Sequence, residues 1–76
     1  MRIIYTHHAI QRMTQRKVSA DQVSETLESP DEIIPGESGE EIAIKRFGAH
    51  EVRVVYGEMD GDKILIYTVM KPRVHN

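Results

Sequence analysis

Three side chains suited to phosphate chemistry recur every fourth residue near the start of the chain: His8, Arg12 and Arg16. In a helix, residues four apart lie about 40° from one another around the axis, so these three form one stripe, which we call the basic stripe. Histidine titrates near neutral pH and can move a proton, whereas arginine presents a rigid fork of donors to phosphate oxygens. The basic stripe therefore predicts phosphodiester chemistry, with His8 as general acid or base and the two arginines stabilising charge on the phosphate.

The same arginines also have a purely structural interpretation. Arginines beside an apolar helix seam often lay their stems over it and pair with nearby acids. Glu25 and Glu28, on the next predicted helix, are the expected partners. The sequence alone leaves open whether the basic stripe is a site or a salt-bridge network.

A helix over residues 7–17 must carry the basic stripe. Thr6 is a suitable N-cap, and Ala9, Ile10 and Met13 fall within one arc that predicts a buried seam. The basic stripe borders this arc, so we expect its side chains where the helix meets a sheet.

A second helix is predicted from residue 19 to about residue 28. Ser19 and Gln22 have the spacing of a capping box. Pro30 ends the helix, because the residue before a proline avoids helical angles. The chain therefore begins with a pair of short helices joined by a few residues.

The rest of the chain has the composition and period of strands. Residues 2–5 are a β-branched run, residues 33–34 a brief extended piece, and the period is two over about 41–47, 51–57 and 63–70. Turns of hairpin length join the last three runs. The pattern predicts an α+β fold in which two N-terminal helices pack on one face of a three- to four-stranded antiparallel sheet.

One register of the predicted hairpin collects the aliphatic residues on a single face of the sheet. If Phe47 lies opposite Glu51, the aliphatic residues collect under the helices, and Lys45 lies directly across from Arg53 on the other face. An anion between the two cations would relieve their repulsion. Together with Tyr67, which can stack a base or donate its hydroxyl, they are the predicted substrate-binding residues.

Size and composition set further limits. A chain of 76 residues predicts a single α+β domain over residues 1–76. Cysteine is absent and the four histidines are scattered, so we expect no disulfide, no metal and no other cofactor. The longest apolar stretch, residues 64–70, is too short to span a membrane, and no signal peptide is recognisable. We therefore expect a cytoplasmic protein without a membrane partner.

Charge is unevenly divided along the chain despite a net charge of -2. Residues 1–17 contain arginine and lysine but no acid, whereas residues 18–41 contain acids but no base. Segregation of this kind can give one surface an attraction for anions in an acidic protein. RNA is the expected partner.

Several segments resemble one protein family. The run His8–Arg16 reads HAxxRMxxR, and residues 23–32 read VxxxLxxPDE. Residues 53–56 and 64–69 have the character of two closing strands. In these features the chain resembles the small bacterial and archaeal family called domain of unknown function 4258.

The resemblance implies a fold and an activity. That family is grouped by fold with RelE-like and barnase-like toxins, which are small metal-independent ribonucleases. On this likeness, His8, Arg12 and Arg16 match the motif positions and are the candidate catalytic residues. Toxin-type nucleases are usually made beside their antidotes, so the resemblance also implies a small antitoxin-like protein partner.

Two function classes remain open from the sequence. The leading hypothesis is a toxin-type RNA-binding protein that cleaves phosphodiesters as a metal-independent endoribonuclease. The alternative is a non-catalytic interaction module that binds a protein partner or a second copy through a free sheet edge.

Overall fold

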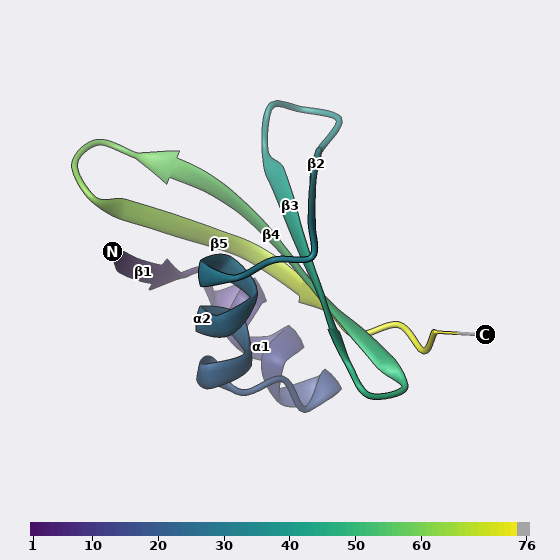
Figure 1. The fold of residues 1–76 in the computed structure, drawn as a ribbon. Coiled ribbons are helices and arrows are strands. Elements are labelled where there is room, and N and C mark those ends of the chain that lie inside the picture. Colours follow the sequence, from purple (N-terminus) through teal and green to yellow (C-terminus); the bar gives the residue numbers. More distant parts are fainter. Residues whose placement is uncertain (75–76) are drawn as a thin grey trace.

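The computed structural model describes residues 1–74, in which a short strand precedes two helices and four further strands follow (Figure 1). The elements are β1 Arg2–Tyr5, α1 His7–Arg16, α2 Ala20–Glu28, β2 Glu32–Pro35, β3 Glu41–Phe47, β4 His50–Met59 and β5 Lys63–Met70. The predicted helices and the α+β class are confirmed. Within residues 1–74, neither helix is long and apolar enough to cross a membrane.

Both helix starts carry the predicted caps. The Thr6 hydroxyl accepts a hydrogen bond from the backbone amide of Ala9 at 3.0 Å. Ser19 and Gln22 form a reciprocal capping box, with side chain to backbone distances of 3.1 Å in both directions. These bonds satisfy amides that have no partner inside a helix, so each helix has a fixed first residue.

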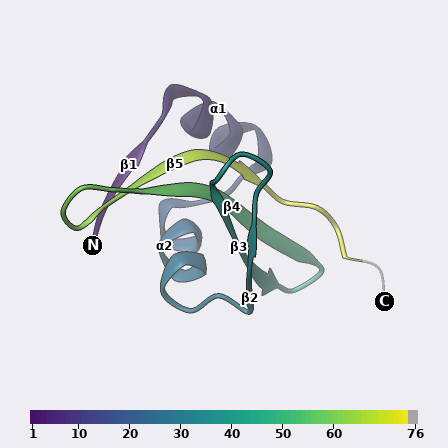
Figure 2. The same ribbon diagram turned by 90° about the horizontal axis from the view of Figure 1, so that it is seen from above.

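The sheet differs from the prediction in strand number and direction. Its order is β1-β5-β4-β3-β2, with antiparallel pairing throughout except that β1 runs parallel to β5. The prediction of a three- to four-stranded antiparallel sheet is therefore wrong: the sheet is five-stranded and mixed. The extended piece at residues 33–34 lengthens into β2, and the helices carry the chain from one edge of the sheet to the other (Figure 2). Both features depend on pairing between distant segments.

Both helices cover the same face of the sheet. Ala9 of α1 and Val23 of α2 are fully buried in one cluster with strand residues, and Figure 1 shows both helices on one side of the sheet. The cluster comprises Ala9, Val18, Val23, Ala43, Val52, Val54, Tyr56, Ile66 and Val69. Ile10, predicted in the buried seam, is instead 52% exposed. Because α1 lies over β5 at the side of the sheet, only a narrow arc of the helix is covered.

The β3–β4 register is shifted by one residue from the predicted one. Phe47 pairs with His50, not Glu51, across a turn of two residues. Gly48 adopts a φ of 62°, which favours such a turn. Since side chains alternate between the faces, a shift of one residue moves every side chain of one strand to the opposite face.

That shift separates two of the predicted substrate-binding residues. Lys45 pairs with Val52 on the side of the helices, whereas Arg53 pairs with Ile44 on the other side. The prediction that Lys45 and Arg53 face each other is therefore wrong.

The side of the sheet turned away from the helices is called here the open face. Cross-strand partners place three central rows on it: Ile34, Ile42, Val55 and Thr68; Glu32, Ile44, Arg53 and Met70; Gly57, Leu65 and Ile4. No helix of residues 1–74 covers these rows (Figure 1). Ile44, between Glu32 and Arg53 on this face, is only 5% exposed although it lies outside the core cluster.

Candidate functional site

Hydrogen bonds at both ends fix α1 alongside β5. At its start, the Thr6 amide donates to the Ile66 carbonyl at 3.1 Å and the Thr6 hydroxyl donates to the Tyr67 carbonyl at 3.0 Å. Just beyond its end, Lys71 Nζ donates to the Lys17 carbonyl at 3.2 Å. The basic stripe therefore runs beside β5 from its middle to its last residue.

The first two members of the basic stripe contact each other. Arg12 Nε donates a long hydrogen bond to His8 Nε2 at 3.4 Å, and Arg12 Nη1 donates to Gln15 Oε1 at 2.8 Å. In this arrangement the lone pair of His8 Nε2 is the acceptor. His8 is exposed and Arg12 half-buried, which leaves the imidazole open to a substrate.

The salt-bridge network considered for the basic stripe is not formed. Within the described residues, no carboxylate lies within ion-pair distance of His8, Arg12 or Arg16, and Glu25 and Glu28 do not contact them. Arg16, moreover, has no hydrogen-bond partner among residues 1–74. Its guanidinium retains all its donors for a ligand.

Arg16 lies in a hollow of about 400 Å³ where the end of α1 meets the end of β5. The hollow, called here the cation cleft, is lined by Arg16, Arg53, Met70, Lys71 and Pro72. The tertiary structure thus brings together three cations from three separate segments. Such a cluster attracts an anion strongly because each charge adds to the same local potential.

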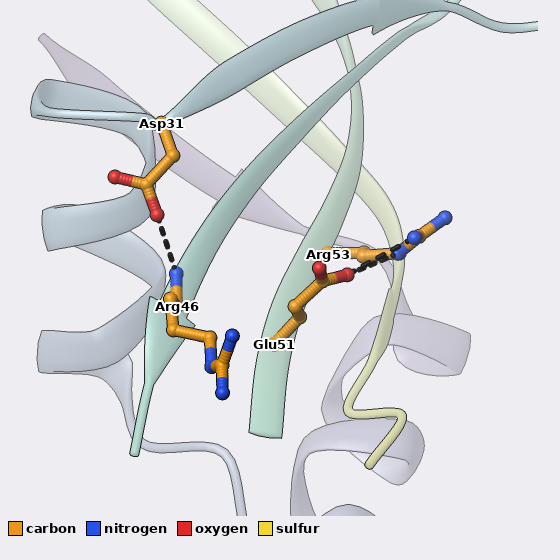
Figure 3. Close-up of polar contacts among 4 residues, drawn as sticks. All are labelled: Asp31, Arg46, Glu51 and Arg53. Atoms are coloured by element: carbon orange, nitrogen blue, oxygen red, sulfur yellow. Dashed lines mark hydrogen bonds and ion pairs between the residues drawn. The ribbon is translucent and has the colours of Figure 1, made fainter. Parts of the chain in front are cut away.

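Arg53 is held in place by a neighbouring carboxylate. Its Nε and Nη2 atoms donate to Glu51 Oε2 at 3.1 and 3.0 Å, as the dashed lines of Figure 3 show. Glu51 neutralises one of the three cationic charges, while those of Arg16 and Lys71 remain uncompensated by any carboxylate within residues 1–74. The cation cleft therefore keeps a surplus of positive charge.

Lys45, predicted to bind substrate, contacts the residue that follows α2. Its Nζ donates to the Ser29 carbonyl at 2.8 Å, at the end of α2 and on the helix side of the sheet. The ammonium group satisfies a carbonyl that has no partner inside the helix. Lys45 therefore does not join the cation cleft.

Tyr67, the third predicted substrate-binding residue, also lies apart from the cation cleft. It falls at a bulge in the β4–β5 pairing, is 42% exposed, and lies over Gly57. It lines a hollow of about 240 Å³, called here the acidic hollow, with Ser38, Gly39, Glu40, Gly57 and Glu58. Of the three predicted substrate-binding residues, only Arg53 therefore lies in the same hollow as a residue of the basic stripe, Arg16.

Lys71 is the third cation of the cation cleft. It directly follows β5, and its place in the cleft depends on α1 docking beside that strand. No local pattern marks it, because a lysine after a strand is common in any small domain.

The titratable groups with clearly shifted pKa values lie away from the cation cleft. Burial raises the pKa of Tyr5. Burial, followed by the charges of Glu41 and Glu58, raises the pKa of Tyr56. Both phenol rings contribute to the core, so these shifts are structural. No group of three side chains able to hold a metal ion occurs among residues 1–74.

A protein-family model described as Domain of unknown function (DUF4258) matches residues 5–71. The chain belongs to the DUF4258 family. The matched span of this DUF4258 chain includes α1 with the whole basic stripe, and it reaches Lys71 in the cation cleft. No curated protein and no solved structure matches the chain.

Proposed function

We propose that this chain is an RNA-binding protein of the toxin type that cleaves phosphodiester bonds without a metal. One observation carries the proposal: Arg16 is exposed in a cleft with Arg53 and Lys71 and has no internal partner among residues 1–74. An uncompensated guanidinium group at a hollow is suited to the phosphates of a nucleic-acid backbone.

The cation cleft would hold a backbone phosphate. Arg53 is oriented by Glu51, and Lys71 is tethered to the Lys17 carbonyl, so two of the three cations are already positioned. Arg16 would close on the phosphate from the end of α1. Positioned donors bind an anion at a smaller loss of side-chain entropy than freely moving ones.

His8 would act two helical turns away, about 12 Å along the axis, on a neighbouring phosphodiester. Once Arg12 releases its hydrogen bond to turn toward the phosphate, the Nε2 atom of His8 would take the proton of a ribose 2′-hydroxyl, whose oxygen then attacks the adjacent phosphorus. The bond from phosphorus to the 5′-oxygen breaks, and the protonated imidazole returns its proton to that leaving oxygen. Arg12, in contact with His8, would stabilise the charge that develops on the phosphate.

Binding is tested with a labelled single-stranded RNA by fluorescence anisotropy over a range of salt concentrations. Arg16→Ala should weaken binding about five- to tenfold and lower the slope of log affinity against log salt by about 0.7. Arg2→Ala is the matched control, since Arg2 pairs with Lys63 at the other end of β5. Equal effects of the two substitutions would contradict a site at the cation cleft.

Cleavage is tested separately with the same RNA, in the presence and absence of a chelator. The wild-type chain should cleave in both conditions, and His8→Ala should lose cleavage while keeping RNA affinity. If the wild-type chain binds RNA but never cleaves it, the catalytic part of the proposal fails and RNA binding stands.

The proposal also covers setting and partner. We place the chain in the cytoplasm, in the RelE-like group, with a small antitoxin-like protein as its inhibitor. The likeness of the helix motif supports the grouping, and the absence of cysteine fits a reducing compartment.

A non-catalytic interaction module is the second candidate, and the uncovered open face favours it. The edge strands β1 and β2 have only four residues each, and β2 ends at Pro35, so the edges offer little for strand addition. Salt separates the two candidates: RNA binding should weaken steeply as salt rises, whereas an apolar protein interface should not.

A further inference from the structure

The cation cleft carries more positive charge than one internal phosphate of a nucleic-acid strand can neutralise. Arg16, Arg53 and Lys71 contribute three positive charges, and none of the lining residues described is acidic. Within residues 1–74, the carboxylate paired with these cations is that of Glu51, which lies 3.0 Å from Arg53 Nη2 (Figure 3). Two positive charges therefore remain, whereas a phosphodiester inside a strand carries a single negative charge.

Two further charged residues near the cleft have opposite signs. Glu32 shares the open-face row of Arg53 but lies two strands away, at about 10 Å. Arg73 directly follows Pro72, which lines the cleft. One negative and one positive charge at the border leave the surplus inside the cleft close to two.

Backbone and side-chain contacts hold the cleft in shape. The Pro72 carbonyl accepts a hydrogen bond from the Glu51 amide at 3.0 Å, which fixes the chain after β5 beside the start of β4. Lys71 Nζ is bound to the Lys17 carbonyl at 3.2 Å. Met70 and Pro72 add apolar surface beside the cations, and apolar surroundings strengthen the attraction between charges.

We infer that the cation cleft selects a terminal phosphate, a phosphomonoester, over the phosphodiesters inside the strand; that the strand is RNA rests on the proposed function. A phosphomonoester carries a charge of about −1.5 to −2 at neutral pH and has three strong acceptor oxygens. Its second charge matches the surplus of the cleft, and its additional oxygen gives each of the three cations an acceptor. An internal phosphate also binds there, but with lower affinity.

The cleavage step proposed for His8 produces no such end. Attack by the 2′-oxygen leaves a cyclic phosphodiester on one product, and the departing 5′-oxygen becomes a hydroxyl group on the other. Neither new end carries a second negative charge. The cleft would therefore distinguish a phosphorylated strand from the ends that this chain itself generates.

The selectivity is tested first without RNA. Small anions are titrated into the isotope-labelled chain, and the Nε–H signals of Arg16 and Arg53 are followed by NMR. Methyl phosphate represents a terminal phosphate, dimethyl phosphate an internal one, and methyl sulfate has the shape of methyl phosphate with one charge. Methyl phosphate should bind about five- to tenfold more tightly than the other two, because of its second charge. Equal affinities for all three anions would overturn the inference.

Variants locate the selectivity. Arg16 is exposed, and Arg16→Ala should reduce the affinity for methyl phosphate to about that for methyl sulfate, because the surplus then falls to one charge. Arg16→Lys keeps the charge and should retain most of the preference. Arg2→Ala, at the other end of β5, should leave the preference unchanged. A preference that survives Arg16→Ala would belong to another site and would contradict the assignment to the cleft.

The second test uses one short single-stranded RNA sequence with three kinds of end. The strands carry hydroxyl groups at both ends, a phosphate at the 5′ end, or a phosphate at the 3′ end. Each unlabelled strand competes with the labelled RNA of the anisotropy assay. A phosphate at one end should improve competition about five- to tenfold, and the strand that improves identifies the end that is bound. No improvement from either phosphate would count against the inference.

The two proposals can fail independently in these measurements. RNA binding that depends on Arg16 but ignores terminal phosphates would reject this inference and leave the proposed function. A preference for methyl phosphate in a chain that binds no RNA would support the charge selectivity of the cleft and reject the proposed function.

Discussion

Lys45 Nζ donates a hydrogen bond of 2.8 Å to the carbonyl oxygen of Ser29, which joins β3 to the last turn of α2. Lys45→Met keeps most of the aliphatic stem and removes the donor and its charge. We expect the free energy of unfolding to fall by about 0.5–1 kcal/mol, because a cation at a helix C-terminus is lost. Urea unfolding measures this change. RNA affinity should be unaltered, and an unchanged stability with weakened RNA binding would return Lys45 to the site.

Gly57 leaves room for the ring of Tyr67. A β-carbon at residue 57 would lie 2.7 Å from the Tyr67 hydroxyl oxygen and 3.1 Å from Cε2, so Gly57→Ala must displace the ring. Because Tyr67 is 42% exposed and its ring can move toward solvent, we expect a loss of no more than about 1 kcal/mol in the free energy of unfolding. The same substitution in a Tyr67→Ala background should cost clearly less, since the clash is then absent. An equal cost in both backgrounds would show that the ring does not limit residue 57.

Glu51 partly neutralises the cation cleft through its ion pair with Arg53. Glu51→Gln removes a negative charge there, so RNA affinity should rise about two- to fivefold at low salt and less at high salt. Fluorescence anisotropy provides the measurement. Glu37→Gln, in the turn between β2 and β3, is the control with the same change in net charge. Weaker binding by Glu51→Gln would mean that orienting Arg53 matters more than the added positive charge.

Tyr56 should make the protein less stable in alkali. Its pKa is raised in the folded state by burial and by Glu41 and Glu58, so the unfolded chain loses the phenol proton first. The free energy of unfolding should therefore fall as pH rises above the unfolded pKa of about 10, and should show no contribution from this group at neutral pH. Tyr56→Phe should reduce the alkaline loss in urea unfolding. An alkaline loss that Tyr56→Phe leaves unchanged would contradict the assignment to Tyr56.

The capping box should stabilise α2 measurably. Ser19→Ala removes the side chain that accepts from the Gln22 amide at 3.1 Å, and the expected loss is about 1 kcal/mol in the free energy of unfolding. Ser24→Ala makes the same replacement inside the helix, where alanine is the better helix former, and should be neutral or slightly stabilising. Thermal or urea unfolding of the two variants separates a cap effect from a general serine effect.

Local features of the fold followed from the sequence. Thr6 and the Ser19–Gln22 pair predicted where the helices begin, and the alternating pattern located β3 and β5 correctly. The basic stripe also needed no tertiary information, because spacing by four residues determines that side chains share one side of a helix. Each of these features depends only on residues within a few positions of one another.

Tertiary structure alone decided how the site is assembled. The cation cleft combines Arg16, Arg53 and Lys71, which are far apart in the chain and meet only because α1 docks beside β5. The turn after Phe47 placed Lys45 on the opposite face from Arg53. The parallel pairing of β1 with β5 is likewise not marked by any local sequence pattern. Register and strand direction are set by the whole sheet and its packing against the helices, so residues close together in the sequence do not determine them.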